Sequence, residues 1–243
     1  MGVELLVLKT GGIKVSDLCT DYEDILRTKF RPLGRVDSFR ALDRLNFTVS
    51  PGEVVGIIGR NGSGKSTLLR TINGFMRPSE GYVETSGRVF LLAGVDPGLI
   101  LGLSGRENVR LLGKAYGKDQ REIEGFVDSV EKFCNLKEAF DRKVGGYSTG
   151  MRGKLGFGII TELEPDILLI DETLGVGDRE FRAKAQERLR NFITQSGTVL
   201  ISTHSLGLAK ELCNRGILLE KGRVEYDGNI EDTIKKYVEI TSS

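Results

Sequence analysis

Four short apolar runs are spread along the chain, and polar residues follow each of them. The runs cover residues 54–58, 87–92, 167–170 and 198–202. Short apolar runs closed by turn signals are typical of parallel strands that are buried on both faces. Because the carboxyl ends of parallel strands meet at one edge of a sheet, the polar residues that follow are candidates for a site. The pattern predicts an α/β fold.

Between the second and third runs, residues 106–143 mix charged residues with apolar residues at near-helical spacing. This spacing predicts a helical subdomain, to which we assign residues 104–160. Its apolar positions are Leu111, Leu112, Ile123, Phe126, Val127, Val130 and Phe133. Residues 18–40 are charged, contain Pro32 and Gly34 and have no clean periodicity, so they form either an inserted loop or an irregular edge element.

The composition fits one functional module. A chain of 243 residues with 39% hydrophobic content can bury one sizeable core, so we expect a single domain over residues 1–243. Its 35 Lys and Arg nearly cancel its 34 Asp and Glu, so it lacks the basic excess of duplex-binding domains, and no nucleic-acid partner is expected. Its three cysteines are far apart and unpaired in sequence, which favours buried thiols in a reducing compartment.

Neither a signal peptide nor a membrane span is expected. The N-terminus carries Glu4 among apolar residues and has no basic start or cleavage site. The longest apolar stretch, 89–103, is interrupted by Asp96 and Pro97 and is shorter than the roughly 20 residues that cross a bilayer as a helix. Any membrane crossing must therefore belong to another chain.

A glycine-rich segment directly follows the first apolar run and precedes a helix-like Leu-Leu-Arg sequence. Its residues are Gly59, Arg60, Asn61, Gly62, Ser63, Gly64, Lys65, Ser66 and Thr67, which fit the P-loop pattern. Glycines let backbone N–H groups approach phosphate oxygens closely, and the helix N-terminus adds partial positive charge. Lys65 would reach the β and γ phosphates of ATP, and Ser66 would bind Mg²⁺. The alternative is a strand-to-helix turn without a ligand, which rarely needs both the lysine and the hydroxyl.

Acidic and imidazole side chains follow the third and fourth runs. Asp171 and Glu172 end an apolar strand, and His204, the only histidine, follows residues 198–202. Beside a P-loop, Asp171 would hold Mg²⁺, Glu172 would orient the attacking water, and His204 would contact the γ-phosphate. Taken alone, the acids would more often cap a helix, and a lone histidine would be structural or exposed.

A short cluster upstream of the acidic strand gains meaning only from its order among these motifs. It consists of Tyr147, Ser148, Thr149, Gly150 and Met151, which on generic grounds is a loop or helix cap. The ordered set of P-loop, pentapeptide, Asp-Glu strand and strand-end histidine resembles the ABC ATPase family over residues 41–237. The resemblance implies a P-loop NTPase fold with a mostly parallel sheet core, an antiparallel β subdomain and a helical subdomain.

The resemblance also implies roles for residues that the patterns alone do not assign. In the family, the pentapeptide meets the γ-phosphate bound by the opposite subunit, through Ser148 and the amide of Gly150. The family's D-loop falls on residues 175–178, where only Asp178 is retained. An aromatic residue ahead of the P-loop commonly stacks on adenine, and Phe39 is the candidate, with Phe30 or Phe47 as alternatives.

Departures from the usual motifs resemble the branch that exports bacterial surface polysaccharides. They lie at residues 104–109, 147–152 and 171–178. This implies a homodimeric ATPase that works with a polytopic membrane permease on the cytoplasmic face of the inner membrane, exporting lipid-linked glycan, O-antigen above all. No C-terminal carbohydrate-binding domain is expected. The family's coupling glutamine is missing from residues 87–110, where Asp96 lies in the corresponding loop. The alternatives are an ABC ATPase for another substrate, or a soluble ABC-type ATPase.

Overall fold

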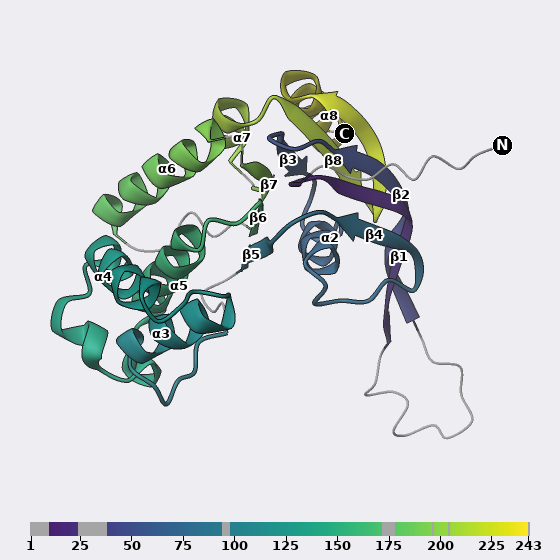
Figure 1. The fold of residues 1–243 in the computed structure, drawn as a ribbon. Helices are drawn as coiled ribbons and strands as arrows, with labels where there is room; N and C mark the ends of the chain where they lie inside the picture. The colour runs from purple at the N-terminus through teal and green to yellow at the C-terminus, as the bar shows by residue number, and fades with distance from the viewer. Residues whose placement is uncertain are drawn as a thin grey trace.

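Two sheets form the centre of the computed structural model, which describes residues 10–23, 38–93, 98–171, 178–195, 197–203 and 205–242 (Figure 1). An antiparallel sheet of three strands has the order β2-β1-β4, and a sheet of six strands has the order β5-β6-β7-β3-β8-β9. The strands are β1 (Ile13–Glu23), β2 (Ser38–Val49), β3 (Val54–Ile58), β4 (Glu80–Thr85), β5 (Val89–Ala93), β6 (Ile167–Asp171), β7 (Thr198–Ser202), β8 (Arg215–Glu220) and β9 (Arg223–Asn229).

The six-stranded sheet is parallel except for β9, and its strands β3, β6, β7 and β8 are buried on both faces. In β6, Leu168 and Ile170 belong to one hydrophobic cluster, whereas Ile167 and Leu169 belong to the other. The α/β prediction is therefore confirmed, and β3 and β7 have the predicted bounds. The second strand begins at Val89 instead of residue 87, because Gly87 has a left-handed φ of 110° and lies in the turn before it.

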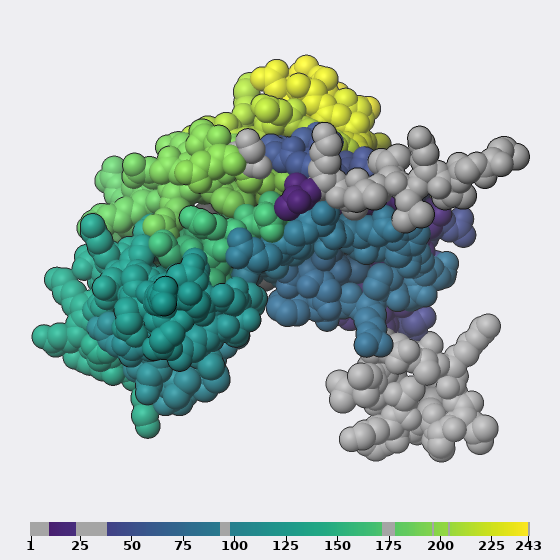
Figure 2. All heavy atoms as spheres, viewed as in Figure 1, coloured from purple at the N-terminus to yellow at the C-terminus, as the bar shows by residue number. Residues whose placement is uncertain are grey.

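Helices cover both faces of this sheet. They are α2 (Lys65–Ile72), α3 (Gly105–Ala115), α4 (Glu122–Cys134), α5 (Thr149–Glu162), α6 (Arg179–Thr194), α7 (Leu206–Leu212) and α8 (Ile230–Ser242), with short 3-10 helices at Lys137–Asp141 and Val144–Gly146. The apolar side of α2 packs between the two sheets. Helices α3, α4 and α5 form a lobe beside the part built from the sheets (Figure 2).

The helical lobe is held together by close packing and one buried amide. A Cβ added at Gly158 of α5 would lie 2.6 Å from Cys134 Sγ of α4, so glycine lets these helices approach closely. Asn108 of α3 is fully buried, and it bonds the backbone N–H and carbonyl of Ile100 at 2.7 and 3.1 Å. The cysteines are free and buried, as the sequence predicts. No helix in the described ranges is long and apolar enough to cross a membrane.

The sequence-based expectation for residues 18–40 is wrong for residues 18–23 and holds for residues 38–40, which lie in β2 at the edge of the three-stranded sheet. Residues 18–23 belong to β1 and residues 38–40 to β2, and β1 is the middle strand of its sheet instead of an edge element. The intervening residues 24–37 lie outside the described part of the chain. The regular alternation of apolar and polar residues is lost in β1, because its register with β2 shifts between Val15 and Leu18 and again before Thr20. Asp17, at the first of these shifts, has a φ of 44°.

Candidate functional site

The glycine-rich loop connects β3 to α2, as predicted. Gly62 and Gly64 have φ of 81° and 107°, values that favour glycine. A Cβ on Gly59 would lie 2.2 Å from the carbonyl of Leu219, so the loop packs tightly against β8. The Lys65 ammonium is buried under the loop and donates to the carbonyl oxygens of Gly59 and Arg60 at 2.8 and 2.9 Å.

Three strand ends meet at this loop. In the parallel ladders, Ser202 of β7 is the partner of both Asp171 in β6 and Ile57 in β3. Ser66 donates to a carboxylate oxygen of Asp171 at 3.1 Å, which joins the first turn of α2 to the end of β6. Hydroxyl and carboxylate oxygens are ligands that Mg²⁺ prefers, so this pair fits such an ion.

Two hydroxyl groups close to these strand ends are buried and have no hydrogen-bond partner among the described residues. They belong to Ser63 in the loop and Ser202 at the end of β7. A buried hydroxyl without a partner costs free energy, and functional sites are where such groups are found. Together with the glycines of the loop and the buried ammonium of Lys65, the arrangement fits a bound polyphosphate.

Several predicted site residues belong to segments other than those that the structure describes. Glu172 and His204 lie outside the described residues, as do residues 175–177 of the D-loop and Asp96. The neighbours of these residues do lie at the carboxyl edge of the sheet, since Asp171 ends β6 and Ser202 ends β7.

The pentapeptide 147–151 begins helix α5. Ser148 is the N-cap and accepts a hydrogen bond from the Met151 N–H at 3.3 Å, while Thr149 and Gly150 lie in the first turn. Tyr147 is buried, and its hydroxyl donates to the Ala139 carbonyl at 2.6 Å. The generic role of a cap is thus present. Figure 1 shows α5 in the helical lobe, apart from α2.

Asp178 links the D-loop to α5. Its carboxylate caps α6 by accepting from the Phe181 N–H at 2.9 Å, and it also accepts a hydrogen bond from the Lys154 ammonium. The hydrogen bond from the Lys154 ammonium lowers the pKa of the Asp178 carboxyl most, and the one from the Phe181 N–H adds to it, so that the pKa falls to about 2. Since Lys154 lies on α5, this ion pair connects the helix that begins at Ser148 to the end of the loop after β6.

The aromatic residues ahead of the loop include one that sequence reasoning missed. Phe39 is 64% exposed, whereas Phe47 is buried in the core and Phe30 lies outside the described residues. Tyr22 of β1 is the ladder partner of Phe39, and its hydroxyl lies 3.2 Å from Thr67 Oγ1 in α2. Directly paired residues of an antiparallel ladder share one face. Neither this pairing nor the exposure of Tyr22 has a local signal in the sequence, because residues 18–23 lack the alternation that marks a strand.

A strand, a glycine-rich loop, a helix and a strand-end carboxylate against the loop's serine define a P-loop nucleotide-binding protein. The family model described as ABC transporter matches residues 42–175. The chain belongs to the ABC transporter family and is an ATPase of that family.

Named relatives and a solved structure agree with this assignment. An O-antigen export system ATP-binding protein, RfbB, of Klebsiella pneumoniae is 38% identical over 82% of this chain and 81% of its own length. A teichoic acids export ATP-binding protein, TagH, of Listeria monocytogenes is 36% identical over 93% of this chain and 68% of its own length. A solved ATP-binding subunit of an ABC transporter is 26% identical, with a TM-score of 0.77 and 93% coverage of both chains.

Proposed function

We propose that this chain is the ATP-hydrolysing subunit of a transporter that exports lipid-linked polysaccharide, with O-antigen as the favoured cargo. The contact between Ser66 and Asp171 carries the ATPase part of the proposal, because it joins the glycine-rich loop of residues 59–67, called the phosphate loop from here on, to the acid at the end of β6. The names of the RfbB and TagH relatives support the class of cargo. The working unit is one module over residues 1–243 with a helical subdomain at about residues 104–160.

Each residue of the site has a role in this proposal. Residues 59–67 would bind the phosphates of ATP, with Lys65 moving from its loop carbonyls to the β and γ phosphates. Ser66 and Asp171 would hold Mg²⁺, which neutralises charge on the phosphate oxygens. Glu172 would orient the attacking water, and His204 would contact the γ-phosphate.

The adenine base would stack on the exposed aromatic pair of Tyr22 and Phe39. Both side chains lie on the face of the β1–β2 ladder from which Tyr22 reaches Thr67 in the helix of the phosphate loop. A pair of exposed rings is a suitable platform for a base, because every base offers a flat π face.

A test of the metal site uses the two acids at opposite ends of β6. Asp171→Asn should lower magnesium-dependent ATP turnover by about 100-fold or more, because a charged ligand close to the phosphates is lost. Asp166→Asn is the matched control: Asp166 precedes β6 and accepts from the Arg88 N–H at 2.7 Å, so its loss should affect stability more than turnover. Equal turnover in wild type and Asp171→Asn would contradict the site.

We further propose that two copies of the chain close on two Mg-ATP. Tyr147, Ser148, Thr149, Gly150 and Met151 of one copy, with Asp178 nearby, would complete the site of the other. Since α5 lies in the helical lobe away from α2, Ser148 would contact nucleotide on a second copy (Figure 1). Turnover should therefore rise more than linearly with protein concentration while the chain is mostly monomeric. Strict proportionality over that range would rule out a shared site.

The variant Ser148→Asp distinguishes the helix-capping role of Ser148 from its proposed contact with a phosphate. Aspartate caps helices as well as serine does, so the free energy of unfolding should change by less than about 0.5 kcal/mol. It cannot donate to a phosphate and adds negative charge, so turnover should fall by about 100-fold. The matched control is Ser104→Asp, at the N-cap of α3 in the same lobe, where Ser104 accepts from the Glu107 N–H at 3.2 Å. Normal turnover in Ser148→Asp would count against the contact.

Transport requires a polytopic membrane permease as partner, with this chain bound peripherally at the cytoplasmic face of the inner membrane. The test in cells replaces the gene with its Glu172→Gln version and measures surface and internal glycan separately. Loss of surface glycan with internal accumulation would support an exporter of glycan. Unchanged surface glycan would favour the two alternatives, which are an ABC ATPase for another cargo and a soluble ABC-type ATPase. Stimulation of ATP turnover by DNA or RNA would favour the soluble ABC-type ATPase.

A further inference from the structure

The end of the β1–β2 ladder carries two adjacent cross-strand pairs of different character. Tyr22 pairs with Phe39, and the preceding pair is Asp21 with Arg40. Successive residues of a strand point to opposite faces of a sheet. The aromatic pair therefore lies on one face, where Tyr22 reaches Thr67, and the charged pair lies on the other.

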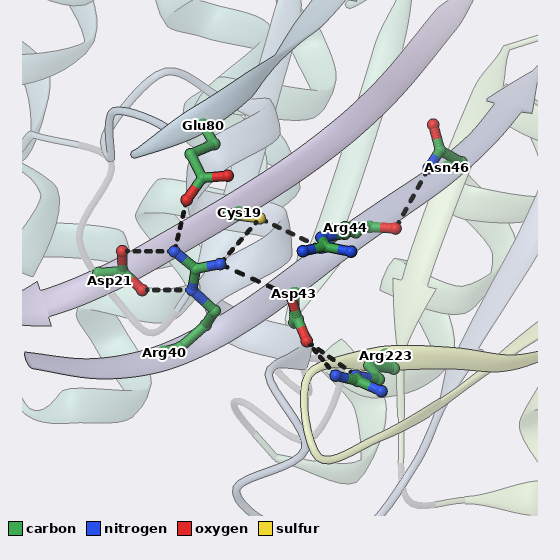
Figure 3. A network of polar contacts seen from close by, with 8 residues as sticks. All are labelled: Cys19, Asp21, Arg40, Asp43, Arg44, Asn46, Glu80 and Arg223. Atoms are coloured by element: carbon green, nitrogen blue, oxygen red, sulfur yellow. Dashed lines mark hydrogen bonds and ion pairs between the residues drawn. The ribbon is translucent and has the colours of Figure 1, made fainter.

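Arg40 joins the three strands of this sheet through one guanidinium group (Figure 3). Its Nε and one terminal nitrogen donate to the two carboxylate oxygens of Asp21 in β1 at 3.0 and 3.3 Å. The same terminal nitrogen donates to Glu80 in β4 at 2.6 Å. The other terminal nitrogen lies 3.7 Å from Asp43 and 3.6 Å from the sulfur of Cys19.

The network continues from Arg40 to the six-stranded sheet. Asp43 accepts two hydrogen bonds from Arg223 in β9, at 2.8 and 2.5 Å. The Asp43 N–H donates to the Gly222 carbonyl at 2.8 Å, and the Gly222 N–H donates to the carbonyl of Ser63 in the phosphate loop at 3.0 Å. Arg40 and its partners thus connect the strands that carry the aromatic pair to the turn that supports the loop.

This network contributes more to position than to stability. The side chain of Arg40 is 37% exposed, and exposed ion pairs are worth little in free energy of unfolding. A two-pronged contact between guanidinium and carboxylate nevertheless fixes the relative position of its two strands. The hydrogen bond that Asp21 accepts from Arg40 lowers the pKa of the Asp21 carboxyl, so both side chains of the pair are charged at neutral pH.

We propose that Arg40 is a positioning residue for the nucleotide base: its contacts with Asp21, Glu80 and Asp43 hold Tyr22 and Phe39 in place opposite the phosphate loop. This inference rests on the proposed function, since it assumes that ATP binds with its base on the aromatic pair. It adds a residue that touches neither the base nor the phosphates. The position of the base therefore depends on a contact made on the opposite face of the sheet.

The experiment compares ATP with inorganic tripolyphosphate, a ligand of similar charge without a base. Binding of each to the full-length chain is measured by calorimetry for wild type, Arg40→Gln and Arg40→Lys. Arg110→Gln is the matched control, because Arg110 of α3 makes a similar two-pronged contact with Glu124 of α4, at 3.0 and 2.7 Å. Loss of a positive charge affects both ligands alike, so the ratio of their affinities reports on the base.

The expected result is a selective loss of ATP affinity. Loss of a stacked aromatic ring weakens base binding by about 5- to 150-fold, which is the effect expected for Tyr22→Ala. Arg40→Gln should produce a part of this loss, about 3- to 10-fold for ATP, with tripolyphosphate binding unchanged and Arg40→Lys between the two. Arg110→Gln should leave both affinities at the wild-type value.

Two results would overturn the inference, and they are distinguishable from each other. If Arg40→Gln weakens both ligands equally, or neither, Arg40 does not act through the base, and the proposed ATPase function stands. If wild type binds no ATP, the proposed function fails and this inference fails with it. Unfolding of each variant in urea shows whether Arg40→Gln is folded, and Arg40→Lys keeps the test informative if it is not.

Discussion

The turn between β8 and β9 offers a sharp test of how the phosphate loop is supported. Gly222 has a φ of 78°. Its N–H donates to the carbonyl of Ser63 in the loop, and its carbonyl accepts from the N–H of Asp43 in β2. A Cβ at this position would lie 2.5 Å from the carbonyl oxygen of Ala41. Gly222→Ala must therefore displace either the backbone of β2 at Ala41 or the turn itself, and the turn is bonded to the loop through the Gly222 N–H.

The magnitude can be worked out by comparison with Gly74→Ala. Gly74 has a φ of 80°, and no described residue has an atom within 4 Å of an added Cβ, so alanine there meets only the left-handed conformational cost. That cost is about 1–2 kcal/mol, offset by about 0.4–1 kcal/mol because alanine restricts the unfolded chain. Gly222→Ala adds a steric cost of about 1–3 kcal/mol, so we expect a total loss of about 1–5 kcal/mol.

The assay is urea unfolding followed by circular dichroism, together with ATP binding by calorimetry. Gly222→Ala should be less stable than Gly74→Ala by about 1–3 kcal/mol and should bind ATP more weakly, because Ser63 loses its support. Gly74→Ala, at the far end of α2, should bind ATP as wild type does. Equal stability of the two variants would refute the steric argument, and wild-type ATP affinity in Gly222→Ala would refute the link to the loop.

Three further predictions concern other parts of the molecule. Lys154 lowers the pKa of Asp178 to about 2, so their ion pair stabilises the fold above about pH 4 and loses this effect as the pH falls towards 2. The difference in free energy of unfolding between wild type and Lys154→Met, measured in urea, should therefore become smaller as the pH is lowered from about 4 to about 2. Burial raises the pKa of the Cys134 and Cys213 thiols to about 12, so a disulfide reagent at about pH 8 should label neither until the protein unfolds, and rapid labelling would contradict their burial. Asn108→Ala should lower the free energy of unfolding by about 2–4 kcal/mol, because buried backbone groups lose their partner; a loss below about 0.5 kcal/mol would show that water replaces it.

The parts of the fold that were predictable carry their signal in adjacent residues. Strands β3 and β7 are apolar and short, and both were predicted with correct bounds. The phosphate loop is equally local, since its glycines, Lys65 and Ser66 follow one another in the sequence. Even the contact between Ser66 and Asp171 could be expected, because parallel strands end at the same edge of a sheet.

The parts that were missed depend on pairing between distant segments. The bulges of β1 break the alternation that marks a strand, so residues 18–23 give no periodic signal. Tyr22 meets Thr67 only because β1 is brought over α2, and these two residues are 45 positions apart. Arg40 likewise reaches Glu80 across 40 positions, and nothing near Arg40 in sequence indicates it.

Ser148 shows why sequence alone could not separate a structural role from a functional one. As N-cap of α5, its oxygen accepts from the Met151 N–H, which fixes the side chain at the start of the helix. An accepting hydroxyl still has a hydrogen to donate, and the exposed N-terminus of α5 adds partial positive charge. The contacts that make Ser148 an ordinary cap are therefore the ones that would orient it towards a phosphate. A serine, a glycine and a helix start are required by both roles, so the pattern is the same for each.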